Sequence, residues 1–396
     1  MELTSYEEKA LDGEYGEAVR LAMRAVVKVG EALGAERLVP VTWAHVSGIS
    51  YKNIGDAGLE FLEELAAKGA RVSVRTTVNP AGMDMEHWRE MGVDEGFAEK
   101  QARVVKALIS MGVEAALTCT PYLYGKVGLG EHLAWAESNA VLYANSILGA
   151  RTNREGGPLA LFEAIVGRAP YVGLHTDEGR RASLVVDFED VRDLVAQGYH
   201  QAAGYLLGRI AGKRVAVAKG LPPMGSWEAK LFLAAVGASG GTGLVYIPGV
   251  SPEEPRIVEG AEEVPVDKRD MEEVLEYFNG KPEAAALGCP HLSSRELEDI
   301  VSYIERRGGA RRPLVLFTAR ALKGRLGDLE KRAEKAGARI FYDTCMVVSP
   351  LRSFLGSGVA VDSAKAAYYL SAQGYAVKLM SRRELLDYVT GGGGED

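Results

Sequence analysis

The chain has 396 residues, of which 47% are hydrophobic and 25% are charged. Its length is about two and a half times that of a typical domain of roughly 150 residues, so we expect two or three packed units. The composition is typical of a globular protein and excludes a disordered, collagen-like or fibrous chain. With 46 basic and 54 acidic residues, the net charge of -8 argues against a nucleic acid as partner.

The cellular setting also follows from composition. No apolar run approaches the roughly 20 residues that a membrane helix requires, and residues 1–8 are acidic and polar, unlike a signal peptide. We therefore predict a cytoplasmic protein that contacts no membrane. Three cysteines in a chain of this length argue against a disulfide framework and leave room for one reactive or metal-binding site. The low Asn and Gln content is typical of a thermophile.

Hydrophobic spacing predicts helices that alternate with strands along the chain, which is typical of an α/β fold. The predicted helices cover 15–33, 57–68, 95–111 and 131–148, with further helices between most later strands. Strands are predicted over 38–43, 71–75, 114–118, 171–174, 215–218, 244–247, 284–287, 314–317, 340–342 and 376–379. The Pro- and Glu-rich stretch 248–266 is predicted to be a linker or excursion.

These elements divide into three predicted units. The first α/β unit covers 1–150 and carries Cys119, and the second covers 151–270. A third α/β unit over 271–390 carries Cys289 and Cys345. The glycine-rich tail 391–396 has nothing to bury and is predicted to be disordered.

Each of the three cysteines follows a predicted strand. Cys119 comes after 114–118, Cys289 after 284–287 and Cys345 after 340–342. Ligands of open α/β sheets bind beyond the carboxyl ends of the strands, so we predict that the three thiols share one site. The alternative for each cysteine is a small buried residue with a packing role. The turn-like sequences around Cys289 and Cys345 favour the shared site.

Three thiolates are soft ligands that suit an iron–sulfur cluster or zinc. The cysteines lie too far apart in the sequence to form a local CxxC knuckle, so only the tertiary fold can bring them together. Three protein ligands leave one metal position open for a substrate, which permits Lewis-acid catalysis.

Polar groups gather at four further places. Residues 45–53 offer small side chains, hydroxyls and backbone N–H groups to an anion, and Asn79-Pro80 forms a polar loop tip. The 137–139 stretch groups a carboxylate, a hydroxyl and an amide on a predicted helix. Lys365 lies in the first turn of another predicted helix, where an ammonium and N–H groups can act together on a carboxylate or phosphate. Ordinary turns and solvated helix faces are the alternatives.

Other common chemistries lack their motifs. The glycine-rich stretches 125–130 and 237–243 match neither the dinucleotide fingerprint nor a P-loop, which argues against nucleotide binding. The six histidines form no HExxH motif, and there is no GxSxG nucleophile elbow.

Several motifs, taken in order, resemble the aconitase X family over nearly the whole chain. They are residues 41–48 (VTWAHVSG), 135–145 with 152–158 (TNREGGP), 288–291 (GCPH), 343–345 (DTC) and 362–365 (DSAK). The resemblance implies an aconitase-like, multi-domain, three-layer α/β/α fold with its site at strand carboxyl ends between domains. It also implies a large subunit that works with a separate small swivelling-domain subunit, because the chain resembles the stand-alone large form.

The resemblance further implies a dehydratase that converts 5-phosphomevalonate into trans-anhydromevalonate 5-phosphate in a mevalonate pathway. The implied cofactor is a 4Fe-4S cluster with Cys119, Cys289 and Cys345 as ligands, and with its fourth iron open to the substrate. The implied general base is a serine of the small subunit, outside this chain. The implied substrate-binding residues are Gly48, Ile49, Ser50, Asn79, Pro80, Glu137, Ser138 and Lys365, with Asn139 as a weaker candidate.

Three alternatives stay open at this stage. Within the same family, a cis-3-hydroxy-L-proline dehydratase needs no pocket for a phosphate. A non-catalytic scaffold protein that binds zinc or a cluster through its thiolates is the second. A cysteine-nucleophile acyltransferase is the third, and it predicts one essential cysteine paired with a histidine, whereas a cluster predicts that all three cysteines matter.

Overall fold

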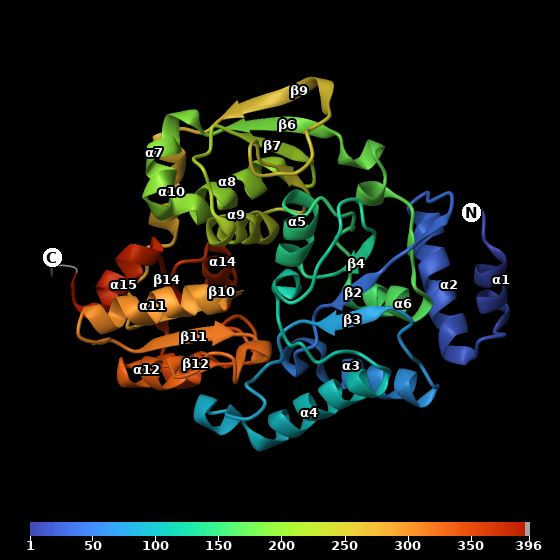
Figure 1. The fold of residues 1–396 in the computed structure, drawn as a ribbon, viewed down its shortest axis with the longest axis horizontal. Coiled ribbons are helices and arrows are strands. Elements are labelled where there is room, and N and C mark those ends of the chain that lie inside the picture. The colour runs from blue at the N-terminus through green and yellow to red at the C-terminus, as the bar shows by residue number, and fades with distance from the viewer. Residues whose placement is uncertain (393–396) are drawn as a thin grey trace.

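A computed structural model describes residues 1–392 of the chain. Figure 1 shows three regions in chain order: a blue to teal region, a green to yellow region and an orange to red region. Gly391 ends the last helix in the left-handed conformation, with φ 78°. The rest of the predicted disordered tail, residues 393–396, lies outside the described residues. Among residues 1–392, no helix has both the length and the apolar composition that crossing a bilayer requires.

The first region is built on a three-stranded parallel sheet of order β3-β2-β4. A short antiparallel pair, β1 with β5, lies beside it, and α2 and α6 pack together and against this region. The elements are α1 (Ser5–Asp12), α2 (Glu17–Ala32), β1 (Leu38–Pro40), β2 (Trp43–Val46), α3 (Tyr51–Ala67), β3 (Arg75–Val78), α4 (Glu95–Ser110), β4 (Leu133–Trp135), α5 (Ser138–Ser146), α6 (Gly157–Val166) and β5 (Arg168–Pro170).

The middle region holds a parallel sheet of order β8-β7-β6-β9. Its α8 and α9 pack closely together, and α9 also reaches α5 and α14 in the neighbouring regions (Figure 1). The elements are β6 (Ala182–Asp187), α7 (Arg192–Leu194), α8 (His200–Ala211), β7 (Ala216–Lys219), α9 (Ser226–Ser239), β8 (Val245–Tyr246), β9 (Ile257–Pro265) and α10 (Lys268–Tyr277).

The last region is a five-stranded parallel sheet of order β12-β11-β10-β13-β14 with helices on both faces. Successive residues alternate between two cores: Ala285 and Leu287 pack with α11 and α15, while Ala286 and Val361 pack with α14. The elements are β10 (Ala284–Leu292), α11 (Ser294–Arg306), β11 (Leu314–Thr318), α12 (Leu329–Lys335), β12 (Ala338–Phe341), α13 (Arg352–Leu355), β13 (Gly358–Val361), α14 (Ala364–Ala372), β14 (Ala376–Leu379) and α15 (Arg382–Thr390).

The predicted α/β class is confirmed, and five local predictions are wrong. The predicted strand 71–75 overlaps β3 only at Arg75. The predicted strand 171–174 lies just after β5 and runs into a single 3-10 turn at Gly173–His175. The predicted linker 248–266 contains strand β9, whose polar sequence reflects its exposed position at a sheet edge. The predicted helix 131–148 is strand β4 followed by α5, because a fully buried strand is as apolar as the helix beside it. The predicted strand 114–118 forms only a single bridge, between Thr77 and Glu114. The division at residues 150 and 270 stays a prediction.

Candidate active site

A pocket of about 520 Å³ lies where strands of two parallel sheets end at their carboxyl edges. The first sheet contributes the segments after β2, β3 and β4, and the last sheet contributes those after β12 and β13. The lining residues are Ser47, Gly48, Ile49, Ser50, Lys52, Asn53, Asn79, Pro80, Cys119, Ala136, Glu137, Ser138, Arg154, Cys289, Cys345, Val347, Val348, Lys365, Tyr369 and Gln373. Every site residue predicted above, Asn139 aside, is in this set.

The three cysteines are free thiols that reach the pocket from three separate segments. Cys119 follows the bridge at Glu114, and Cys345 comes shortly after β12. Cys289 lies inside β10, where the pairing register with β11 shifts between Leu287 and Leu292. Cys289 therefore follows the regularly paired part of β10, as predicted, but it lies within the strand as a whole and not after it. Burial raises the pKa of all three thiols, to about 12 for Cys119.

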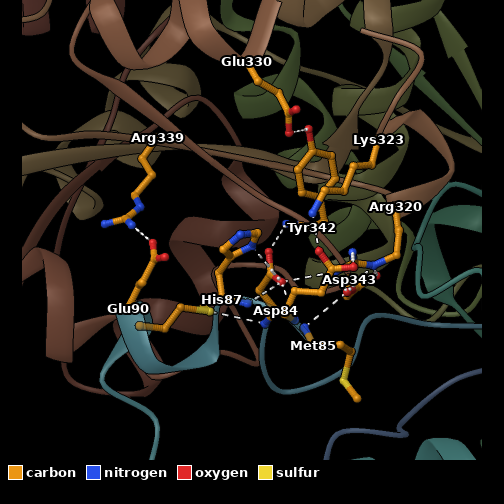
Figure 2. Close-up of polar contacts among 12 residues, drawn as sticks. Asp84, Met85, His87, Glu90, Arg320, Lys323, Glu330, Arg339, Tyr342 and Asp343 are labelled. Atoms are coloured by element: carbon orange, nitrogen blue, oxygen red, sulfur yellow. Dashed lines mark hydrogen bonds and ion pairs between the residues drawn. The ribbon is translucent and has the colours of Figure 1, made fainter.

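The loop that carries Cys345 is held by ion pairs to another part of the chain. Figure 2 shows Arg320 against Asp343, and the Arg320 Nε donates to both carboxylate oxygens at 2.8 and 2.7 Å. The Met85 backbone N–H donates to the same carboxylate at 3.2 Å. The Asp343 backbone has φ 62°, a left-handed conformation that few residues other than glycine adopt. These contacts fix the residue two positions before Cys345.

A buried chain of hydrogen bonds orients the polar floor of the pocket. The Trp43 Nε1–H donates to Thr77 Oγ1 at 2.9 Å, and Thr77 Oγ1 lies 2.8 Å from His45 Nδ1. His45 Nε2 lies 2.9 Å from Asn79 Oδ1, and Asn79 Nδ2 donates to Glu137 Oε2 at 2.7 Å. Since an amide oxygen only accepts, His45 carries its proton on Nε2. Burial lowers the pKa of His45 to about 4, so the ring is neutral near pH 7.

Glu137 and Lys365 form a buried ion pair across the pocket. Burial alone raises the pKa of Glu137, but the charge of Lys365 and the amide of Asn79 outweigh it and lower that pKa to about 2. Lys365 lies in the first turn of α14, as predicted, and its Nζ is 3.3 Å from Ser138 Oγ. Its pKa is raised because Glu137 outweighs the effect of burial. The pair is fully ionised near neutral pH.

Two other cations line the pocket and have no carboxylate partner within residues 1–392. Lys52 donates to the Gln373 side-chain oxygen at 2.8 Å, and Arg154 donates to the Gly240 carbonyl at 2.8 Å. Sequence reasoning did not single out Arg154, Tyr369 or Gln373, because nothing in the sequence shows which face of these segments meets the pocket. Asn139, the weaker candidate, lies behind it and donates to the Cys119 carbonyl at 2.9 Å.

The donor set of the pocket is rich in thiols. Three soft thiols face the same pocket, which fits an iron–sulfur cluster or zinc. Among residues 1–392, no three His, Cys, Asp or Glu side chains converge so that they can hold a single metal ion. Thiols that share a pocket without meeting at one point can each bind a different atom of a larger group.

The fold and the pocket define a multi-domain α/β protein with a thiol-lined site between parallel sheets. Three sequence models match it: the aconitase X first domain over residues 1–178, second domain over 182–276 and third domain over 282–391. The chain belongs to the aconitase X family. The family implies an iron–sulfur cluster in general, in agreement with the three thiols.

Named relatives support this assignment. The phosphomevalonate dehydratase large subunit of Methanothermobacter thermautotrophicus is 45% identical over 92% of both chains, and that of Methanocaldococcus jannaschii is 40% identical over 93% of this chain and 95% of the relative. The cis-3-hydroxy-L-proline dehydratase of Pseudomonas aeruginosa is 34% identical over 93% of this chain but only 66% of its own length. All are named dehydratases, which are hydro-lyases, and the words "large subunit" imply a small-subunit partner.

A solved structure gives the same result. The crystal structure of Thermococcus kodakaraensis aconitase X in its holo-form matches 98% of this chain and 100% of that chain, with a TM-score of 0.90 and 39% identity. The predicted fold is therefore confirmed. The roles of the individual site residues stay predictions.

Proposed function

We propose that this chain is the large subunit of an iron–sulfur hydro-lyase that removes water from (R)-5-phosphomevalonate. The product is trans-anhydromevalonate 5-phosphate, an intermediate of a mevalonate route to isoprenoids. The observation that carries the proposal is the pocket itself, which combines three free thiols, one ionised Glu–Lys pair and two cations that have no carboxylate partner within residues 1–392. The relatives at 45% and 40% identity are named for this reaction.

Cys119, Cys289 and Cys345 are the proposed ligands of a 4Fe-4S cluster, one thiolate for each of three irons. When bound there, the cluster supplies a Lewis acid, at the iron without a protein ligand, that takes up the charge developing on the leaving hydroxyl. A tertiary hydroxyl is a poor leaving group, so a Lewis acid at this position would lower the barrier to its departure. Buried thiols with raised pKa values pay a desolvation cost as free thiolates, and bonding to metal offsets it.

The residues of this chain bind and orient the substrate. Lys52 and Arg154 are proposed to hold the phosphate, because their charges face the pocket and are not neutralised by a carboxylate within residues 1–392. The Ser50 hydroxyl is buried and has no hydrogen-bond partner among the described residues, so it is free to bind a substrate oxygen. Lys365 and Ser138 are proposed to orient the substrate carboxylate.

The general base is proposed to come from the small subunit. Within residues 1–392, Glu137 is the pocket's only carboxylate, and no histidine lines it. With its pKa held at about 2, Glu137 is too weak a base to remove a carbon-bound proton, and Lys365 is protonated. The isolated large subunit should therefore be nearly inactive.

The test is anaerobic purification of the chain with its co-expressed small subunit, followed by iron and sulfide analysis and dehydration assays. We expect about four irons for each large subunit, lost in each Cys→Ser variant, and turnover of 5-phosphomevalonate but not of cis-3-hydroxy-L-proline. Turnover of the amino acid instead would move the assignment to the other dehydratase of the family. Zinc without activity would favour a scaffold protein, and one essential cysteine without metal would favour a nucleophile.

A further inference from the structure

His291 contacts the segments of all three cysteines. It is fully buried in β10, two residues after Cys289. Its backbone N–H donates to Cys119 Sγ at 3.3 Å. Its ring reaches Thr118, directly before Cys119, and Thr344, directly before Cys345. One residue therefore connects three segments that are far apart in the sequence.

The partners of the ring determine how it is protonated. His291 Nε2 lies 2.8 Å from the Thr344 backbone carbonyl, which can only accept, so Nε2 carries a proton. His291 Nδ1 lies 3.1 Å from Thr118 Oγ1, and that hydroxyl oxygen already accepts from the Thr120 N–H at 3.2 Å. A ring that carries its proton on Nε2 has a lone pair on Nδ1, so the Thr118 hydroxyl donates to Nδ1. Both ring nitrogens are used, each by a different cysteine segment.

The backbone of His291 is also held by a buried ion pair. Its carbonyl accepts from Lys230 Nζ at 2.9 Å, and Lys230 is paired at 2.6 Å with Glu296, at the start of α11. All three residues are buried. Because the backbone of His291 is held in place, the hydrogen bonds of its ring fix the positions of the two segments that they reach.

We propose that His291 is the positioning residue that sets the three cysteine segments relative to one another. It acts through Cys119 and Cys345 and touches no reacting atom. The inference rests on the proposed function in assigning the cysteines as cluster ligands, but the hydrogen bonds that carry it concern this chain alone. Its backbone N–H toward Cys119 Sγ is kept by every substitution except proline, so such variants isolate the contribution of the ring.

The first test uses the complex of both subunits, reconstituted anaerobically with iron and sulfide. We expect His291→Ala to retain less than half of the wild-type iron and sulfide and to lose iron to a chelator at least ten times faster. His291→Gln, which keeps an N–H donor for the Thr344 carbonyl, should recover part of both losses. The matched control is His200→Gln, since His200 is also buried and its Nε2 has no hydrogen-bond partner within residues 1–392. Wild-type iron content, absorption spectrum and release rate in His291→Ala would overturn the proposal.

The second test needs no cluster. Amide hydrogen exchange is measured on the metal-free complex, and His291→Ala should raise exchange at 117–121 and 343–346, which are remote from it in sequence, with α8 unchanged. Unchanged exchange in both segments would overturn the proposal. A wild-type chain that takes up no iron would instead overturn the proposed function, and hydrogen exchange would still decide the role of His291.

Discussion

The ammonium of Lys365 and the carboxylate of Glu137 form an ion pair that links α14 of the last region to the start of α5 in the first. Both side chains are buried, so neither charge is well solvated once its partner is removed. The pair therefore connects the first and last regions of the molecule. It also places one negative and one positive charge in the pocket.

Replacing Lys365 by methionine should lower both stability and activity. Breaking a buried pair by removing one partner costs about 3–5 kcal/mol, because the remaining charge is left uncompensated. We expect a loss of this order in the free energy of unfolding by urea at pH 7, and a rate of dehydration at least about 100 times lower. The double variant Lys365→Met with Glu137→Gln should recover much of the stability and none of the activity.

The control for this prediction is Lys213→Met, which removes an exposed lysine on the surface of the middle region. It should change the unfolding free energy by less than about 0.5 kcal/mol. If Lys365→Met unfolds at the same urea concentration as the control, the Glu137 carboxylate is not buried with an uncompensated charge, and the geometry described for the pair is wrong.

Lys52 and Arg154 should determine affinity for the phosphate of the substrate. A hydrogen bond to a charged group contributes about 1.5–3 kcal/mol, so Lys52→Ala and Arg154→Ala should each raise KM for 5-phosphomevalonate about 10- to 100-fold. The effect on kcat should be small, because the phosphate lies away from the reacting carbons. Steady-state kinetics of the two-subunit enzyme, with inorganic phosphate as a competing ligand, measure both quantities.

Lys106→Ala is the matched control for these variants, since Lys106 is an exposed lysine of α4 outside the pocket. It should leave KM unchanged. A selective loss of kcat in Lys52→Ala, with KM and phosphate inhibition unaffected, would assign this residue to the chemical step and remove the phosphate site.

The sequence predicts the components of the site better than their connections. Ser50, Asn79 and Cys345 could be predicted because each follows an apolar run, and carboxyl ends of parallel strands gather at one edge. Arg154 could not, since its turn-rich segment gives no sign of facing the pocket. The three contacts of His291 join residues 53, 172 and 173 positions apart, and no periodicity reports such pairs. Strand β9 was missed because an exposed edge strand has a linker-like composition.

Glycine at position 288 should be required for the segment that carries Cys289. Its φ is 110°, and a Cβ atom there would lie 2.3 Å from the Phe317 backbone carbonyl oxygen, which cannot rotate away. Gly288→Ala should lower the free energy of unfolding by about 1–3 kcal/mol and reduce the iron content of the complex. Urea denaturation of the metal-free chain and iron analysis of the reconstituted complex measure the two effects.

Gly308→Ala separates backbone strain from the steric clash. Gly308 also has a positive φ, 83°, but a Cβ there would meet no atom of residues 1–392 within 4 Å. This control should show a smaller stability loss and normal iron content. Equal effects of the two substitutions would mean that the close approach to Phe317 does not constrain the Cys289 segment.

Glu163 and Glu155 should make the stability of the metal-free chain fall as pH rises. Glu163 is fully buried in α6, and neither of its carboxylate oxygens has a hydrogen-bond partner in the part of the chain that the structure describes. Glu155 Oε1 has none there either. Burial raises the pKa of Glu155 to about 7, and burial together with Glu155 raises the pKa of Glu163 well above its usual value near 4.5. At pH values between the unfolded-state pKa near 4.5 and the raised folded-state pKa values, the folded chain binds more protons than the unfolded chain. The free energy of unfolding therefore falls as pH rises from about 4.5 through 7.

In urea titrations from pH 5 to 8.5, Glu163→Gln should flatten this decline and should be more stable than wild type at pH 8. The variant Glu276→Gln, at an exposed position, should follow the wild-type curve. Parallel curves for wild type and Glu163→Gln would show that Glu163 does not titrate in this range and that its carboxyl group finds a partner in solution.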